Sequence, residues 1–229
     1  AFRELRETYS AATVKLLAAT LKAAFTLAVD RGVMAAERSP FFRAYKLEPG
    51  NERDTPLPAD KIAALLEVIS PRYRNYVLFA ILSGLRREEQ LGLRWENIDF
   101  EHRSLVIRRT KQRKPHREPL SDWMLEILLE QKQLDSEWCF PTQKGGRYKE
   151  GSWTGIWSHW YKKIGIYRVH TWHDLRHTCA TLAASGGESL LAIGRILGQG
   201  NPQTTRRYAH LLETAARGSL ETVSKELTK

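Results

Sequence analysis

A segment of proline, glycine and charged residues divides this chain into two parts. Between Glu48 and Pro58 these residue types replace the apolar periodicity found on either side. Proline is not accommodated in a helix interior or a central strand, so neither element passes through this stretch. At 229 residues the chain is long enough for a small domain joined to a larger one. We predict a small domain at residues 1–47, a linker at residues 48–58 and a larger domain at residues 59–229.

Helical periodicity dominates both parts. Ahead of the linker, apolar residues recur every three or four positions from Ser10 to Asp30, with Ser10 as the N-cap and Gly32 as the stop. Beyond the linker, the same reading predicts helices at residues 60–69, 72–83, 88–93, 121–132, 152–164, 174–184, 189–197 and 213–227. Trp153, Trp157 and Trp160 share one helical face, a spacing that favours core packing over base stacking.

Two short segments have strand-like alternation. They lie at residues 105–109 and 117–120, and the basic stretch at residues 111–116 between them predicts a hairpin tip. The predicted fold is therefore mainly α with a small antiparallel β-sheet, an α+β arrangement.

The chain is strongly basic. Its formal net charge is +10 and its pI is about 9.7, which favours a polyanionic partner such as nucleic acid. The basic residues cluster between Glu101 and Leu120: Arg103, Arg108, Arg109, Lys111, Arg113, Lys114 and Arg117.

The cysteine content and the apolar runs bear on location. Cys139 and Cys179 show no metal-binding spacing and are too few for a disulfide framework, so we expect a reducing compartment and two small core residues. No apolar run approaches the roughly 20 residues of a membrane span, and no secretory signal opens the chain. We expect a cytoplasmic protein that does not enter a membrane. Because Ala1 is followed almost at once by a helical pattern, we also expect an upstream segment.

Two arginines have contexts suited to a phosphodiester substrate. Negative charge grows on the phosphate oxygens as a nucleophile adds, so catalysis requires fixed donors near those oxygens. A guanidinium stays charged and offers a planar fork to phosphate. Arg86 follows Gly84-Leu85, and Arg176 lies in a histidine-rich stretch. Either arginine alone would be read as a surface salt-bridge residue, but together they predict a phosphate site.

A nucleophile and two proton carriers accompany these arginines. Tyr208 is the candidate nucleophile, and neighbouring cations and a base must activate it because a phenol is protonated at pH 7. His173 is the candidate base, and Lys111 on the hairpin is the candidate acid for the leaving oxygen, with Lys114 as its rival. His177 is expected to pack or to support the site.

The spacing of His173 and His177 also allows a different reading. Histidines at i and i+4 are typical of a zinc pair, which would indicate a metallohydrolase. That motif has glutamate at its second position, whereas Asp174 stands here, and Arg176 would place a cation beside the metal. We therefore expect no metal and no other cofactor.

The ordered motifs resemble those of the tyrosine recombinase family, the phage integrases. They are Ser83-Gly84-Leu85-Arg86, Thr110-Lys111, His173-Asp174-Leu175-Arg176-His177, Leu197-Gly198-Gln199 and Thr205-Arg206-Arg207-Tyr208. The resemblance implies that Arg86, Lys111, His173, Arg176 and Tyr208 form the active site, with position 199 as a further site residue. It also implies a site-specific recombinase that forms a 3'-phosphotyrosyl link and a Holliday junction, without ATP or metal.

The resemblance has further implications for partners. It implies double-stranded DNA sites, a homotetramer on DNA and, in some systems, accessory DNA-bending proteins, in the nucleoid of a prokaryotic host. Residues 1–47 resemble the latter part of a core-binding domain. Residues 219–227 are a candidate helix for exchange between subunits, with folding back on their own domain as the alternative. The expected DNA-binding residues are Arg108, Arg109, Arg113, Lys114, Arg206 and Arg207, and the expected supporting residues are Glu89 and His177.

Gln199 departs from the family pattern. The family has histidine or tryptophan there, and an amide can donate a hydrogen bond but cannot transfer a proton. Loss of one such donor costs on the order of 10² to 10³ in rate elsewhere, so we expect slowed cleavage. Two alternatives remain: a catalytically weakened DNA-binding fragment, and a type IB topoisomerase, whose eukaryotic form has lysine where His173 stands.

Overall fold

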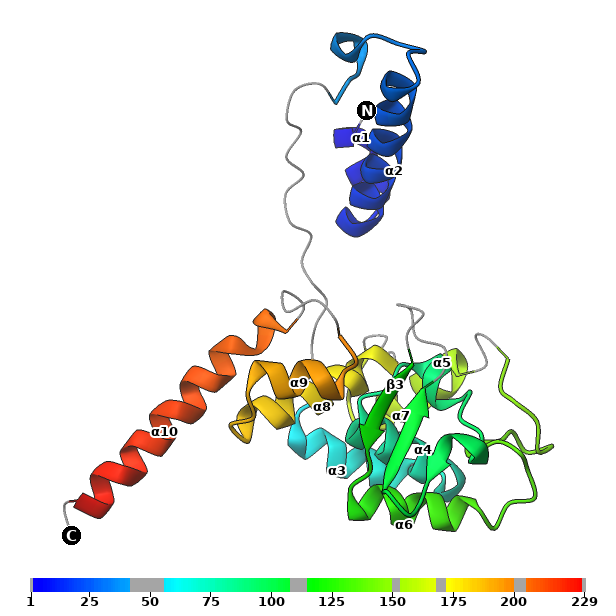
Figure 1. Ribbon diagram of the computed structural model, residues 1–229, viewed down its shortest axis with the longest axis vertical. Coiled ribbons are helices and arrows are strands. Elements are labelled where there is room, and N and C mark those ends of the chain that lie inside the picture. The colour runs from blue at the N-terminus through cyan, green and yellow to red at the C-terminus, as the bar shows by residue number, and fades with distance from the viewer. Residues whose placement is uncertain are drawn as a thin grey trace. The chain divides into compact units, whose positions relative to one another are not determined.

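A computed structural model describes residues 2–41, 56–107, 115–149, 153–167, 172–199 and 205–227 (Figure 1). The chain separates into two compact units, Ala1–Asp54 and Thr55–Lys229. Lys111, Arg108, Arg109, Arg113 and Lys114 lie outside the described residues, as do most of the predicted linker and the side chain of Trp157.

The first unit is helical. It contains α1 (Phe2–Thr8), α2 (Ala11–Asp30) and the 3-10 turn η1 (Ala36–Arg38). The Ser10 side chain accepts a hydrogen bond from the Thr13 backbone at 3.2 Å, so the predicted N-cap of α2 is confirmed.

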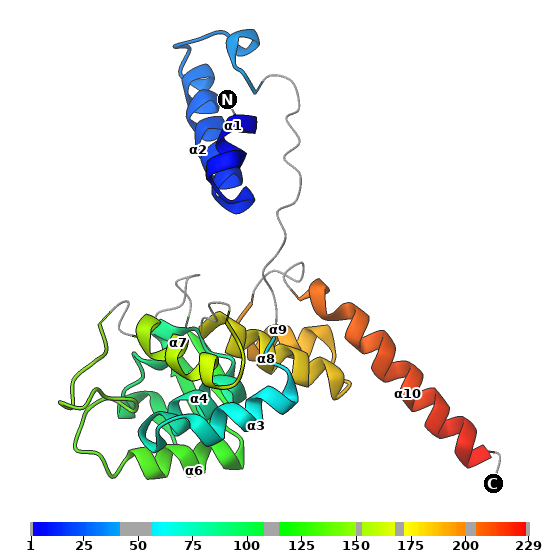
Figure 2. The ribbon, with the colours of Figure 1, turned by 180° about the vertical axis from the view of Figure 1, so that it is seen from behind.

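Five helices surround the main core of the second unit. These are α3 (Ala59–Val68), α4 (Pro71–Ser83), α6 (Asp122–Gln131), α7 (Thr154–Lys163) and α8 (Trp172–Ser185). Helix α4 is buried on nearly all sides because it packs against both α6 and α8, and α3 packs against α7 (Figure 2). Trp153 and Trp160 lie in this core, as the helical spacing predicted.

A three-stranded antiparallel sheet in the order β1-β2-β3 completes this part of the unit. The strands are β1 (Ile98–Asp99), β2 (Ser104–Ile107) and β3 (His116–Pro119). Ile107 pairs with His116, so the β2-β3 hairpin is in register up to the segment that the structure leaves undescribed. The predicted fold class is confirmed.

The last elements form a smaller apolar cluster with the second half of α8. They are α9 (Leu190–Ile196), the 3-10 turn η4 (Arg206–Tyr208) and α10 (Ala209–Leu227). The side chains of Ala180, Ala184, Ile193, Leu197 and Tyr208 are buried together. Helix α10 starts at Ala209, earlier than predicted, and residues 219–227 continue it without a break.

One predicted helix is much shorter than expected. Residues 88–93 were predicted to be helical, but α5 spans only Arg87–Gln90. The chain leaves the helix because the Leu93 carbonyl accepts a hydrogen bond from the Cys139 backbone at 2.9 Å. Both cysteines are buried, as predicted. Among the described helices, none is both long and apolar enough to cross a bilayer.

Candidate active site

The corner between α4 and α5 positions Arg86. Gly84 ends α4 in the left-handed region with φ 60°, which favours glycine. Arg86 then caps α5, and the Glu89 carboxylate accepts from both its backbone N–H and its Nη1 at 2.9 Å. Glu89 is only 7% exposed while the Arg86 side chain is 28% exposed. The buried carboxylate thus fixes a guanidinium that still reaches solvent.

Arg176 joins three elements. It lies in α8 and is 4% exposed. Its Nη1 donates to the Gly84 carbonyl at 2.6 Å, and its Nη2 donates to the Leu197 carbonyl at the end of α9. Burial, and next the charge of Arg86, lower the pKa of Arg176 to about 10, so the group remains charged at neutral pH. This buried cation therefore connects the α4-α5 corner, α8 and the end of α9.

Two histidines stand one turn apart on α8. The rings of His173 and His177 have centroids 6.4 Å apart. Desolvation, followed by the charge of Arg176, lowers the pKa of His173 below its ordinary value. At neutral pH His173 is thus a neutral imidazole at the surface of the site.

Tyr208 lies against the second of these histidines. It ends η4, is 5% exposed, and its hydroxyl is 2.6 Å from His177 Nδ1. Burial raises the pKa of the phenol, while the charges of Arg207 and Arg176 oppose that rise. The resting phenol is protonated and directly hydrogen-bonded to an imidazole. The sequence motifs favour His173 as the base, whereas the contact that the structure describes for the hydroxyl is with His177.

The turn after α9 carries Gln199. Gly198 has φ 54°, and the Gln199 backbone donates to the Gly194 carbonyl at 2.9 Å. Among the described residues the buried Oε1 of Gln199 has no hydrogen-bond partner. The turn directly follows Leu197, which binds Arg176. The structure therefore attaches the start of the turn that carries position 199 to the arginine, although 22 residues lie between Arg176 and Gln199 in sequence.

A histidine and a glutamate that sequence reasoning did not select lie beside this turn. They are His116 and Glu118 of β3, whose Nε2 and Oε1 atoms are 3.0 Å apart. A short His-x-Glu pattern in a strand has no signature of its own, and only the alternation of β3 could have shown that both side chains share a face.

The predicted DNA-binding residues fall in two groups. Arg206 is exposed and Arg207 is partly exposed in η4, immediately before Tyr208. The hairpin cations, including Lys111, lie outside the described residues. Among those that are described, no three histidine, cysteine, aspartate or glutamate side chains are grouped to hold a metal ion.

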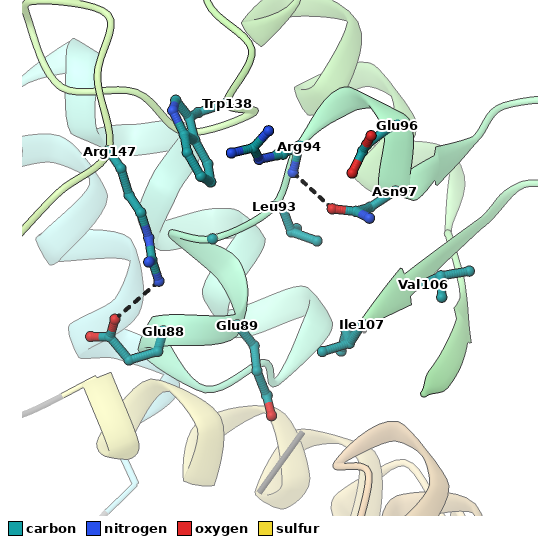
Figure 3. Close-up of a pocket in the computed structure, with 11 residues that line it drawn as sticks. Glu88, Glu89, Leu93, Arg94, Glu96, Asn97, Val106, Ile107, Trp138 and Arg147 are labelled. Atoms are coloured by element: carbon teal, nitrogen blue, oxygen red, sulfur yellow. Dashed lines mark hydrogen bonds and ion pairs between the residues drawn. The ribbon is translucent and has the colours of Figure 1, made fainter. Parts of the chain in front are cut away.

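An open cavity of about 380 Å³ is lined by residues of α5, of the segment that follows it and of β2 (Figure 3). Its arginines interact within the protein: Arg94 stacks 4.4 Å from the centroid of the Trp138 ring, and Arg147 pairs with Glu88 at 3.4 Å. Glu89 contributes to its wall, but Arg86, Arg176 and Tyr208 do not. The cavity therefore shares Glu89 with the cluster around Arg176 but is lined by none of that cluster's arginines.

Known proteins are similar to this chain in sequence and in fold. A profile described as the phage integrase family matches residues 56–215. The tyrosine recombinase XerA of Thermococcus onnurineus (strain NA1) is 31% identical over 194 residues, covering 77% of this chain and 68% of that protein. The integrase of Salmonella phage P22 is 24% identical over 197 residues, covering 80% of this chain and 50% of that protein. The chain thus spans about half to two thirds of these relatives' lengths.

Solved structures give the same fold. The Tn1549 transposon integrase in complex with transposon right end DNA aligns with a TM-score of 0.81 at 20% identity, covering 97% of this chain and 82% of that one. A lambda integrase tetramer bound to a Holliday junction aligns with a TM-score of 0.73 at 19% identity, covering 88% and 62%.

The profile match extends over most of the second unit and includes every described member of the Arg176 cluster. With the XerA similarity it establishes that this chain belongs to the phage integrase family of tyrosine recombinases.

Proposed function

We propose that this protein is a site-specific DNA recombinase that cuts and rejoins strands through Tyr208. The observation that carries the proposal is the 2.6 Å contact between the Tyr208 hydroxyl and His177, one turn from His173 and beside buried Arg176. A protonated phenol needs a base and nearby cations before it attacks phosphorus, and this cluster supplies both.

The chemical step follows from these groups. The Tyr208 oxygen attacks the scissile phosphorus, the bond to the 5' oxygen breaks, and a 3'-phosphotyrosyl link forms. The phenol proton passes to an imidazole, for which His177 is in place. Lys111, which the family resemblance identifies as the general acid, donates a proton to the 5' oxygen. The freed 5' hydroxyl of one strand then attacks the link on its partner, so the phosphodiester energy is retained without ATP or a metal.

The arginines stabilise the charge that develops on phosphate. A guanidinium has five N–H donors, and the structure assigns two of those of Arg176 to carbonyls. The remaining donors, together with partly exposed Arg86, can contact the phosphate oxygens. His173, held neutral, can donate to the same oxygens or share in proton transfer.

The partners proposed for this chain are those of its relatives. Solved integrases include one bound to transposon end DNA and a tetramer bound to a Holliday junction. We extend double-stranded DNA sites, a homotetramer, the junction and exchange of the end of α10 to this protein. The first unit would serve as part of a DNA-clamping domain, and the enzyme would act on DNA in the cytoplasm with accessory DNA-bending proteins.

The decisive experiment compares the protein with Tyr208→Phe on supercoiled plasmid that carries the DNA flanking its own gene, in EDTA. We expect a covalent protein-DNA adduct on a denaturing gel, and no adduct for the variant, because only the hydroxyl is removed. An unchanged adduct in the variant would exclude Tyr208 as the nucleophile. Relaxed circles without recombinant products would indicate topoisomerase activity.

A second candidate is a DNA-binding fragment with weakened chemistry, which Gln199 favours. In that case the protein binds the plasmid but forms little adduct. Gln199→His should then increase adduct formation by on the order of 10²-fold, since it restores the family's donor. Equal rates for the two proteins would mean that position 199 does not limit cleavage.

A further inference from the structure

The His116–Glu118 pair is an ionisable unit inside the protein. The two residues alternate on β3 and face the same side, with side chains 27% and 5% exposed. Their Nε2 and Oε1 atoms are 3.0 Å apart. Among the described residues Nε2 has no well-aligned hydrogen-bond partner, so the contact is an ion pair by distance. A carboxylate this buried depends on a close cation or a proton.

The pair touches the turn that carries Gln199. A Cβ added at Gly198 would lie 3.2 Å from the His116 ring, so the ring lies directly against this backbone. The backbone of Arg195, at the end of α9, also acts on the imidazole through a hydrogen bond. Since Leu197 lies between Arg195 and Gly198 and binds Arg176, the His116 ring supports the turn that fixes the buried arginine.

Titratable groups of α5 and α8 act on the pair. Glu89 of α5 acts on both members, and Arg176 of α8 acts on Glu118. Cys179 of α8 also interacts with Glu118, and burial raises the pKa of that thiol to about 12, so it stays neutral.

These groups determine the charge offered to a phosphate. Arg86, Arg176 and a protonated His116 are three cations, and Glu89 and Glu118 are two carboxylates. The described cluster is therefore 3 − 2 = +1 with the proton on the pair and 2 − 2 = 0 without it. In the second state the buried carboxylates fully balance the two arginines, which weakens their attraction for a scissile phosphate.

We propose that the His116–Glu118 pair is a proton-dependent positioning element, which holds the Leu197–Gln199 turn against Arg176 and keeps the cluster positive while it retains its proton. The inference rests on the proposed cleavage function and adds that the protonation of the pair regulates the cleavage rate. His116 acts through the turn and the arginine and is a positioning residue.

The direction of the pH effect follows from the same contacts. The neighbouring Glu118 raises the pKa of His116 above its ordinary 6.5, and burial raises the pKa of Glu118 above 4.5. Both shifts favour the state in which the pair holds one proton. Because the folded pKa of His116 is raised, its contribution is complete below pH 6.5 and is lost as pH rises through the folded value.

The test is the rate of adduct formation from pH 6 to 9 on the same plasmid, for the wild type, His116→Gln, Glu118→Gln and the double variant. His116→Gln should be about 10- to 100-fold slower at pH 6.5, because Glu118 loses the cation that balances it and, where its carboxylate stays ionised, opposes the charge of Arg176. The double variant should recover most of that rate and lose the decline with pH that we assign to the pair, since its cluster stays at +1.

His102→Gln is the matched control. His102 lies in the turn between β1 and β2 and pairs with Asp99 at 3.0 Å, but its side chain is 70% exposed. This variant should keep the wild-type pH profile. A wild-type profile in His116→Gln, or a double variant as slow as His116→Gln, would overturn the inference and leave the proposed function intact.

If the wild type forms no adduct at any pH, the proposed function fails. The protonation of the pair is then measured by NMR titration of His116. His116 should titrate above pH 6.5 in the wild type and at a lower pH in Glu118→Gln. Titration at or below the ordinary value in the wild type would contradict the pairing itself.

Discussion

At the scale of single residues, two histidines one turn apart have different surroundings. His173 has a lowered pKa because of desolvation and nearby Arg176, whereas His177 contacts the Tyr208 hydroxyl at 2.6 Å. The sequence favoured His173 as the base and His177 as a supporting residue. Because the hydroxyl contacts His177, we predict that His177 is the first acceptor for the phenol proton and that His173 contacts a phosphate oxygen.

Substitution at His177 tests this division of roles. His177→Phe should slow single-turnover adduct formation by on the order of 10²-fold, the smaller end of the range for a lost general base, with DNA affinity unchanged. His210→Phe, at an exposed position two residues after Tyr208, is the control and should cleave at the wild-type rate. Equal cleavage by wild type and His177→Phe would return the base role to His173.

The sequence pointed to the arginines and the tyrosine because each has a recognisable local context. Their assignment as a site remains a prediction, to be tested by the experiments above. His116 had no such context: its relevance comes from contact with Gly198, which lies 82 residues later. Contacts between residues so far apart depend on tertiary packing, which local patterns do not encode.

At the scale of elements, the corner after α4 is both a helix end and a support for Arg176. Gly84 adopts a left-handed conformation, and its carbonyl accepts from Arg176 Nη1. A Cβ at this position would lie 2.8 Å from Leu197 Cδ2 and 3.1 Å from Cys179 Sγ. The corner thus has space only for glycine.

Gly84→Ala should therefore lower the free energy of unfolding for two reasons. Left-handed strain contributes about 1 kcal/mol and overpacking about 1 to 3 kcal/mol to the loss of unfolding free energy in urea. Gly187→Ala is the matched control, because Gly187 has φ 88° but nothing within 4 Å of an added Cβ, so only strain applies. An equal loss of unfolding free energy in the two variants would show that the side chains around Gly84 move aside without cost. Cleavage should fall only in Gly84→Ala.

The elements themselves were predicted unevenly. Long amphipathic stretches such as α2 and α6 were found within a few residues of their ends, since apolar spacing and N-caps define them. Strand β1 was missed because two residues carry no periodicity. Helix α5 was overextended because the competing hydrogen bond from Cys139 to Leu93 is not local.

At the scale of the whole molecule, the net charge of +10 should dominate its nonspecific affinity for DNA. Neutralising phosphates releases counterions, so log affinity should fall steeply and linearly with log salt concentration. Each phosphate-contacting cation contributes close to one unit of that slope.

Arg206→Ala should reduce the slope of log affinity against log salt concentration by about 1. The slope is measured by fluorescence anisotropy with a duplex of random sequence. Salt is varied from about 50 to 200 mM, the range over which such effects are large. Arg206 is exposed in η4 beside Tyr208. Lys132→Ala is the control, since that ammonium lies 5.0 Å from the centroid of the Phe100 ring, and it should leave the slope unchanged. An unaltered slope for Arg206→Ala would remove this residue from the DNA interface.

The position of Arg176 bears on how an inactive form of this protein should be made. Its guanidinium binds two backbone carbonyls from different elements, and the residue is 4% exposed. Truncation would therefore leave buried acceptors unsatisfied and destabilise the fold. Tyr208→Phe removes one oxygen atom and keeps the ring in its apolar cluster. For trapping uncleaved assemblies, or for use as a programmable DNA anchor, the tyrosine is therefore the position to change, and the buried arginine is the one to preserve.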